Sequence, residues 1–119
     1  MNNVNEYKDI VAFHPGYYIA DIIEDMGISQ AEFTARIGIT AKNLDQLING
    51  QANITNDLAN KLSVMIGTSA EVWLNLQDTY NQKLIEIQQA KDFDGQKELA
   101  KRLTIILKEK YVIEIEHSA

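Results

Sequence analysis

Cysteine is absent from the 119-residue chain, which excludes disulfide bonds and metal sites built from thiolates. Proline occurs once, as Pro15, so the six glycines are the main markers of where structural elements end. No stretch approaches the ~20 apolar residues that a membrane-spanning helix needs. The start of the chain, residues 1–6, has neither the basic residues nor the apolar run of a signal peptide. We therefore expect a cytoplasmic protein with no membrane partner.

Positive charge is also scarce. The chain has 11 Lys and Arg residues against 17 Asp and Glu residues, a net charge of −6. The imbalance lies mainly in residues 1–76, which hold four cations and nine anions, whereas residues 77–119 hold seven and eight. Proteins that bind nucleic acids usually have a basic surface, so any DNA-binding interpretation has to account for this acidity.

Apolar residues recur at helical spacing in a series of segments, most of which end at a glycine. We predict five helices, at about residues 16–26, 29–37, 40–49, 55–66 and 68–91. Ser29, Thr40 and Thr68 are the expected N-caps, and the fourth helix is expected to start near Thr55. Asp92–Gly95 is predicted to break the chain before a sixth helix at about 96–110. The tail, residues 111–116, alternates apolar and acidic side chains, which is typical of a short edge strand or of a segment ordered by a partner.

These predictions describe an all-α fold: a lambda-repressor-like five-helix domain with a helix-turn-helix, plus a C-terminal helix and a short tail. We assign residues 1–12 to an N-terminal arm, 13–91 to the helix-turn-helix domain, and 92–119 to dimerisation or partner contact. The apolar stripes of the last two helices are longer than one small domain needs. We therefore expect a symmetric homodimer.

Residues 30–49, QAEFTARIGITAKNLDQLIN, have the layout of a helix-turn-helix, with two short helices joined at Gly38. Apolar side chains on both helices would hold them at a fixed angle. That geometry leaves the start of the second of these helices free to enter a major groove. Asn43 and Gln46 are suited to bidentate hydrogen bonds with adenine, and Lys42 to guanine or a phosphate. Gln30, at a helix N-terminus, is suited to a phosphate contact.

Three segments resemble the HigA/VapI family of plasmid-maintenance antidotes, within the Xre, lambda-repressor-like helix-turn-helix group. They are FHPGYYIADIIEDMGISQAEFTARIG (13–38), ITAKNLDQLING (39–50) and GTSAEVWLNLQDTY (67–80). The resemblance covers about two-thirds of the chain. It implies a dimeric antitoxin that binds a palindromic operator of double-stranded DNA upstream of its own genes and neutralises a toxin protein. By position, the resemblance implies a DNA-contacting set of Gln30, Thr40, Ala41, Lys42, Asn43 and Gln46.

The predicted recognition helix differs from the family in composition, because family members are usually richer in Arg and Ser there, whereas this chain has Ala41 and Asp45. Between Ser29 and Thr55 there are two cations and two anions. Phosphate contacts from cations supply much of non-specific DNA affinity. We therefore expect DNA binding that is weak or that requires dimerisation or a partner.

Two other interpretations remain open. The chain is alternatively a protein-interaction module that keeps the helix-turn-helix fold with little DNA binding, or the front portion of a longer helix-turn-helix regulator. An enzyme is not expected, because there is no cysteine, no Ser–His–acid pattern, no glycine-rich phosphate loop and no carboxylate–His cluster. We expect no cofactor, no metal and no catalytic residues. His14 is predicted to have a local structural role, and Trp73 and Tyr80 to lie in the core or in a dimer contact.

Overall fold

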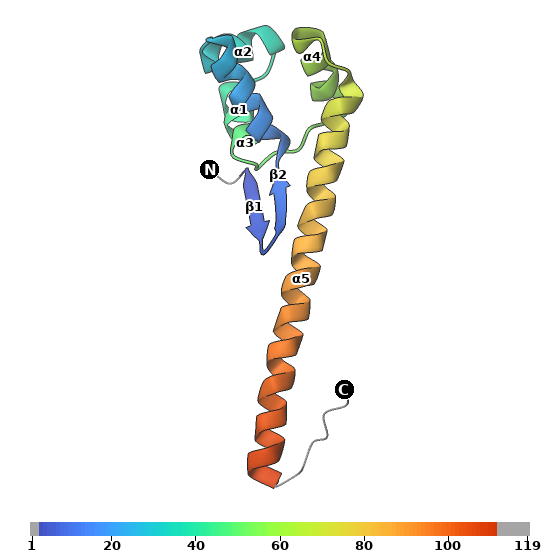
Figure 1. Cartoon of the computed structure of the whole chain (residues 1–119). Coiled ribbons are helices and arrows are strands. Elements are labelled where there is room, and N and C mark those ends of the chain that lie inside the picture. The colour runs from blue at the N-terminus through green and yellow to red at the C-terminus, as the bar shows by residue number, and fades with distance from the viewer. Residues whose placement is uncertain (1–2, 112–119) are drawn as a thin grey trace.

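A computed structural model of the protein describes residues 3–111. The chain forms an N-terminal hairpin of two strands, β1 (Val4–Tyr7) and β2 (Ile10–Phe13), followed by five helices. The helices are α1 (Pro15–Met26), α2 (Gln30–Ile37), α3 (Ala41–Ile48), α4 (Asn56–Ile66) and α5 (Ala70–Tyr111). Helices α1–α4 gather at one end, while α5 runs away from them as a long rod (Figure 1). The part of the chain that the structure describes is 71 Å long and about 23 Å across.

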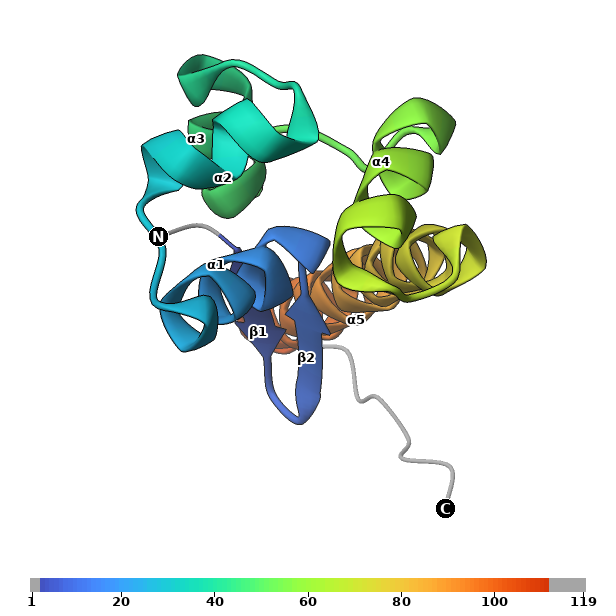
Figure 2. The same ribbon diagram turned by 90° about the horizontal axis from the view of Figure 1, so that it is seen from above.

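The predicted all-α, five-helix fold is confirmed, with the small hairpin as an addition. The core lies where α1–α4 meet the first turns of α5, as the view along α5 shows (Figure 2). Its largest fully buried apolar side chains include one from each of the five helices: Ile19, Phe33, Leu44, Leu62 and Trp73. Each helix thus contributes one apolar face to a shared centre, as the helical spacing of apolar residues predicts.

The predicted break at Asp92–Gly95 is wrong, because α5 is continuous from Ala70 to Tyr111. Glycine inside a helix costs only about 1 kcal/mol relative to alanine, so a single Gly95 weakens a helix without ending it. Asp94 is also held in place from outside the helix. It accepts a hydrogen bond from the Tyr7 hydroxyl (2.5 Å) and pairs with the Lys8 ammonium (2.7 Å). The predicted sixth helix is therefore the distal part of α5. The tail prediction for 112–116 falls outside the described residues.

Helix capping follows the sequence with one correction. The hydroxyls of Ser29 and Thr40 accept hydrogen bonds from the backbone N–H three residues later, as predicted, and the Thr55 hydroxyl does the same at the start of α4. At the start of α5 the predicted cap, Thr68, is wrong by one residue, since Ser69 caps the helix instead. The Thr68 hydroxyl accepts a hydrogen bond from the indole N–H of Trp73 (2.9 Å) and so satisfies a buried donor.

The hairpin was not predicted, and it occupies the residues assigned to an N-terminal arm. β1 and β2 pair antiparallel, with Val4 opposite Phe13 and Tyr7 opposite Ile10. Ala12 packs against Tyr80 and Ile87 of α5. The side-chain amide of Asn5 donates to the Tyr80 hydroxyl (2.9 Å). The hairpin is therefore fastened along α5 and covers one side of the helix.

His14 joins the hairpin to α1 and is completely buried. Its Nδ1 accepts a hydrogen bond from the Gly16 N–H (2.9 Å), so the imidazole is the N-cap of α1, and the predicted structural role is confirmed. The ring also packs edge-on against Tyr80, with centroids 4.9 Å apart. Nδ1 has to be unprotonated to accept, which requires the neutral imidazole.

Acid should therefore destabilise the fold through His14. Burial lowers the pKa of His14 below its ordinary value of 6.5. The unfolded chain binds this proton more readily, so stability is complete above pH 6.5 and falls as the pH drops below it. The slope contributed by this residue is at most about 1.4 kcal/mol per pH unit. We expect urea melts to show this loss in the native chain and a shallower one in His14→Asn, which keeps a capping side chain. Equal slopes in both proteins would contradict the assignment.

Candidate nucleic-acid interface

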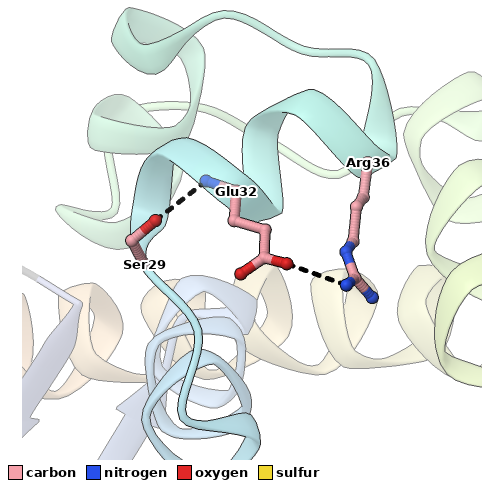
Figure 3. A network of polar contacts seen from close by, with 3 residues as sticks. All are labelled: Ser29, Glu32 and Arg36. Atoms are coloured by element: carbon pink, nitrogen blue, oxygen red, sulfur yellow. Dashed lines mark hydrogen bonds and ion pairs between the residues drawn. The ribbon is translucent and has the colours of Figure 1, made fainter.

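The helix-turn-helix unit consists of α2, the turn and α3. Capping residues define where α2 begins and ends. Ser29 begins α2, its hydroxyl accepting from the Glu32 N–H (3.0 Å). The Glu32 carboxylate does not return to the cap but pairs with Arg36 (2.8 Å), four residues on (Figure 3). Gly38 then ends α2 with φ of 79°, a left-handed conformation that favours glycine. Its N–H donates to the Thr34 carbonyl (2.9 Å), which closes the turn.

The α3 helix is strongly amphipathic. Leu44, Leu47 and Ile48 are buried against the core, together with Phe33 and Ile37 of α2. These contacts fix the angle between the two helices. The opposite face of α3 is therefore presented to solvent rather than used for folding.

The structure brings the predicted DNA-contacting residues to this outer surface. Of the set, Gln30, Thr40, Ala41, Lys42 and Asn43 are exposed, and Gln46 is half-buried. Gln30 is the first residue of α2, whereas the others lie at the N-cap or in the first two turns of α3. Thr40 and Asn43 also line a shallow groove of about 320 Å³, together with Asn53 and Thr55 of the next loop. Their contact with DNA stays a prediction.

The charges around this surface are largely engaged within the chain. Arg36 pairs with Glu32, and Lys61 of α4 pairs with Asp57 (3.1 Å). Lys42 takes part in none of the ion pairs formed among residues 3–111 and is exposed. It is therefore the cation of the motif best placed to meet a phosphate or a base.

Two buried polar side chains that the sequence analysis did not single out for a role hold the C-terminal end of α3 and the loop that follows it. The Asn3 side-chain amide donates to the Ile48 carbonyl (2.9 Å), in the last turn of α3. Gln77 of α5 accepts from the Ile54 N–H (2.8 Å) and donates to the Asn53 side chain (3.3 Å). A buried backbone group without a partner is costly, so these bonds stabilise the exit from α3. Gln77 does lie in the sequence run that carries the family resemblance.

We also searched the described residues for a metal-binding cluster and for a membrane-spanning helix. Residues 3–111 contain no group of three or more His, Asp or Glu side chains arranged to hold a metal ion. None of the helices over the same residues is both long enough and apolar enough to cross a membrane.

Comparison with known proteins identifies relatives of this arrangement. A helix-turn-helix family model matches residues 19–73. An HTH-type transcriptional regulator of Escherichia coli K12, YddM, whose function is uncharacterised, is 36% identical over 67 residues, covering 56% of this chain and 71% of the relative.

Solved structures share the fold. One, from Nostoc punctiforme, is described as an antidote protein of a plasmid maintenance system. It is 35% identical with a TM-score of 0.64, covering 71% of this chain and 92% of that one. The antitoxin HigA of Pseudomonas aeruginosa, solved with the higBA promoter, is 26% identical with a TM-score of 0.62. That match covers 70% of this chain and 91% of HigA.

Proposed function

Because the chain belongs to the HigA/VapI family of helix-turn-helix proteins, we propose that it is the antitoxin of a toxin–antitoxin module and represses its own operon. Members of this family are DNA-binding transcriptional regulators and antitoxins, which are not enzymes. The protein would act in the cytoplasm as a homodimer on a palindromic operator. Its second partner would be a toxin encoded beside it, and a basic toxin would complement the acidic N-terminal half.

The observation that carries the proposal is the outer face of α3. Lys42 and Asn43 are exposed in the first turn, with their helix held rigidly by buried apolar neighbours. An asparagine side chain at this position offers a donor and an acceptor to the edge of adenine in the major groove. A dimer would set two such helices about 34 Å apart, one turn of DNA. The relative from Pseudomonas aeruginosa, solved with promoter DNA, supports the same use of the fold.

The direct test is fluorescence anisotropy with the DNA upstream of the protein's own gene, against a scrambled duplex of equal length. We expect selective binding at low salt that weakens as salt rises, because each phosphate contact releases counterions. The slope of log affinity against log salt should be small, since Lys42 is the cation of the motif that no carboxylate engages among residues 3–111. Equal affinity for the two duplexes at low salt would refute the regulator.

A protein-interaction module with little DNA binding is the second candidate function. The charges around α3 favour it, because few cations are left to contact DNA phosphates. Arg36 and Lys61 are engaged by carboxylates, and Asp45 is exposed on the outer face of α3 beside Lys42. This candidate predicts a co-purifying protein partner together with no shift of any duplex at low salt. The pull-down and the anisotropy measurement together separate the two candidates.

A further inference from the structure

The distal half of α5 carries an apolar face that nothing in the described chain covers. The α5 stripe consists of Phe93, Leu99, Ala100, Leu103, Ile106, Leu107 and Tyr111, all exposed. Phe93 is 59% exposed and Leu103 is 51% exposed, although both are large and apolar. Contiguous apolar patches of this kind are rare on monomeric proteins and mark interaction surfaces.

The stripe faces away from the rest of the molecule. Tyr80, Ile87 and Asp94 contact the hairpin and are spaced by seven residues, so they share one side of α5. At about 100° per residue, the α5 stripe lies on the opposite side of the helix. The hairpin therefore cannot cover it. The distal part of α5 extends past the hairpin, as Figure 1 shows.

We propose that the α5 stripe pairs in parallel and in register with the same stripe of a second copy of this chain. Phe93, Ala100 and Leu107 follow one another at intervals of seven residues, and Leu103 lies between the last two at the spacing of a coiled-coil seam. Leu99 and Ile106 widen the seam on one flank. The other two positions of the seam are polar, Gln96 and Lys110, and a polar residue at a seam position specifies register at a cost in stability.

Charge favours a second copy over other occupants. Residues 92–111 hold five cations and four anions, whereas residues 1–91 have a net charge of −5. Electrostatic repulsion between two copies of the chain is therefore smaller at residues 92–111 than over the acidic remainder. In a parallel pair, Asp92 of one helix would lie beside Lys97 of the other, five residues later, which is the spacing of an interhelical ion pair. A strongly acidic or strongly basic partner would repel about half of the charged side chains in this segment.

The orientation rests in part on the proposed function. Parallel pairing keeps both helix-turn-helix units at the same end of the rod, where they can share one operator. Antiparallel pairing would place them at opposite ends of an assembly longer than the 71 Å of one chain. The seam itself, however, follows from the stripe and its charges and does not require DNA binding.

Sedimentation equilibrium of the full chain tests the association. We expect twice the chain mass of 13.5 kDa. Leu103→Asp places a carboxylate in each half of the seam and should raise the dissociation constant about 100-fold or more. The matched control is Ile105→Asp: Ile105 is 53% exposed but lies on the hairpin side, so the dissociation constant should not change. A monomeric native chain, or equal effects of the two variants, would overturn the proposal.

Cysteine cross-linking tests the orientation of the two helices. The native chain has no cysteine, so every disulfide must form at an introduced residue. Ala100→Cys and Leu107→Cys should each form disulfide-linked dimers under mild oxidation, whereas Lys101→Cys, on the hairpin side, should not. An antiparallel pair brings only positions near its axis together, so cross-linking at one site or at neither would overturn the parallel seam. A cross-linked protein that ignores its upstream DNA would instead refute the regulator and leave the seam intact.

Discussion

Replacement of Gly16 by alanine is expected to lower the free energy of unfolding by about 3 kcal/mol. A Cβ atom at this position would lie 1.8 Å from the Leu47 carbonyl oxygen and 2.6 Å from its carbon. These are backbone atoms of α3, so no side chain can rotate to make room. The first turn of α1 and the last turn of α3 would have to separate, which would disturb the buried contacts between the two helices.

Urea denaturation followed by far-UV circular dichroism measures this loss, and Gly95→Ala is the matched control. A Cβ atom at Gly95 would meet nothing within 4 Å, and the residue lies inside α5. That substitution should leave stability unchanged or raise it by up to about 1 kcal/mol, because alanine favours helices. A Gly16→Ala protein as stable as the native one would show that the close approach of α1 and α3 is not required.

The same substitution should weaken operator binding, because Leu47 belongs to the proposed recognition helix. Comparing Gly16→Ala with the native chain at low urea, where both remain folded, separates displacement of α3 from global unfolding. We expect a lower affinity for the upstream duplex with the affinity for a scrambled duplex retained.

Asn43→Ala should reduce affinity for the operator by about 10- to 100-fold, the range expected for one bidentate base contact. Asn43 is exposed, and although its backbone N–H serves the Thr40 cap, its side chain is not needed for that bond. The helix should therefore survive the change. Affinity for the scrambled duplex should be unaffected, since the lost contact is to a base and not to a phosphate.

Fluorescence anisotropy with both duplexes measures this effect, and Asn60→Ala is the control. Asn60 is an exposed asparagine of α4, outside the proposed recognition helix. Lys42→Ala provides a contrast, because loss of a phosphate contact weakens both duplexes and lowers the salt slope by about 1. If Asn43→Ala bound the operator as selectively as the native chain, Asn43 would not be a specificity residue.

The candidate site was predictable from the sequence because its signals are local. Ser29 and Thr40 cap bonds three residues away, and Gly38 closes a turn with Thr34, four residues earlier. The outer face of α3 follows from the periodicity that buries Leu44 and Leu47. Physical signals that act within one or two turns can be read directly from the order of residues.

The contacts that hold the recognition unit on its scaffold were not predictable in the same way. Asn3 reaches Ile48 across 45 positions, Asn5 reaches Tyr80 across 75, and Tyr7 reaches Asp94 across 87. None of these residues differs, in its local sequence, from an ordinary polar surface residue. Their burial or pairing arises only when distant segments are brought together.

By itself, the sequence determined the helix-turn-helix, its caps, its outward polar face and the family, because these depend on neighbouring residues and their spacing. Only the tertiary structure decided that Gly16 is a contact point for α3, that a hairpin fastens to α5, and that α5 runs unbroken through Asp92–Gly95. For the hairpin and for α5, weak local preferences were outweighed by packing or hydrogen bonds from elsewhere in the chain. Local propensities amount to about 1 kcal/mol per residue, which such contacts readily exceed.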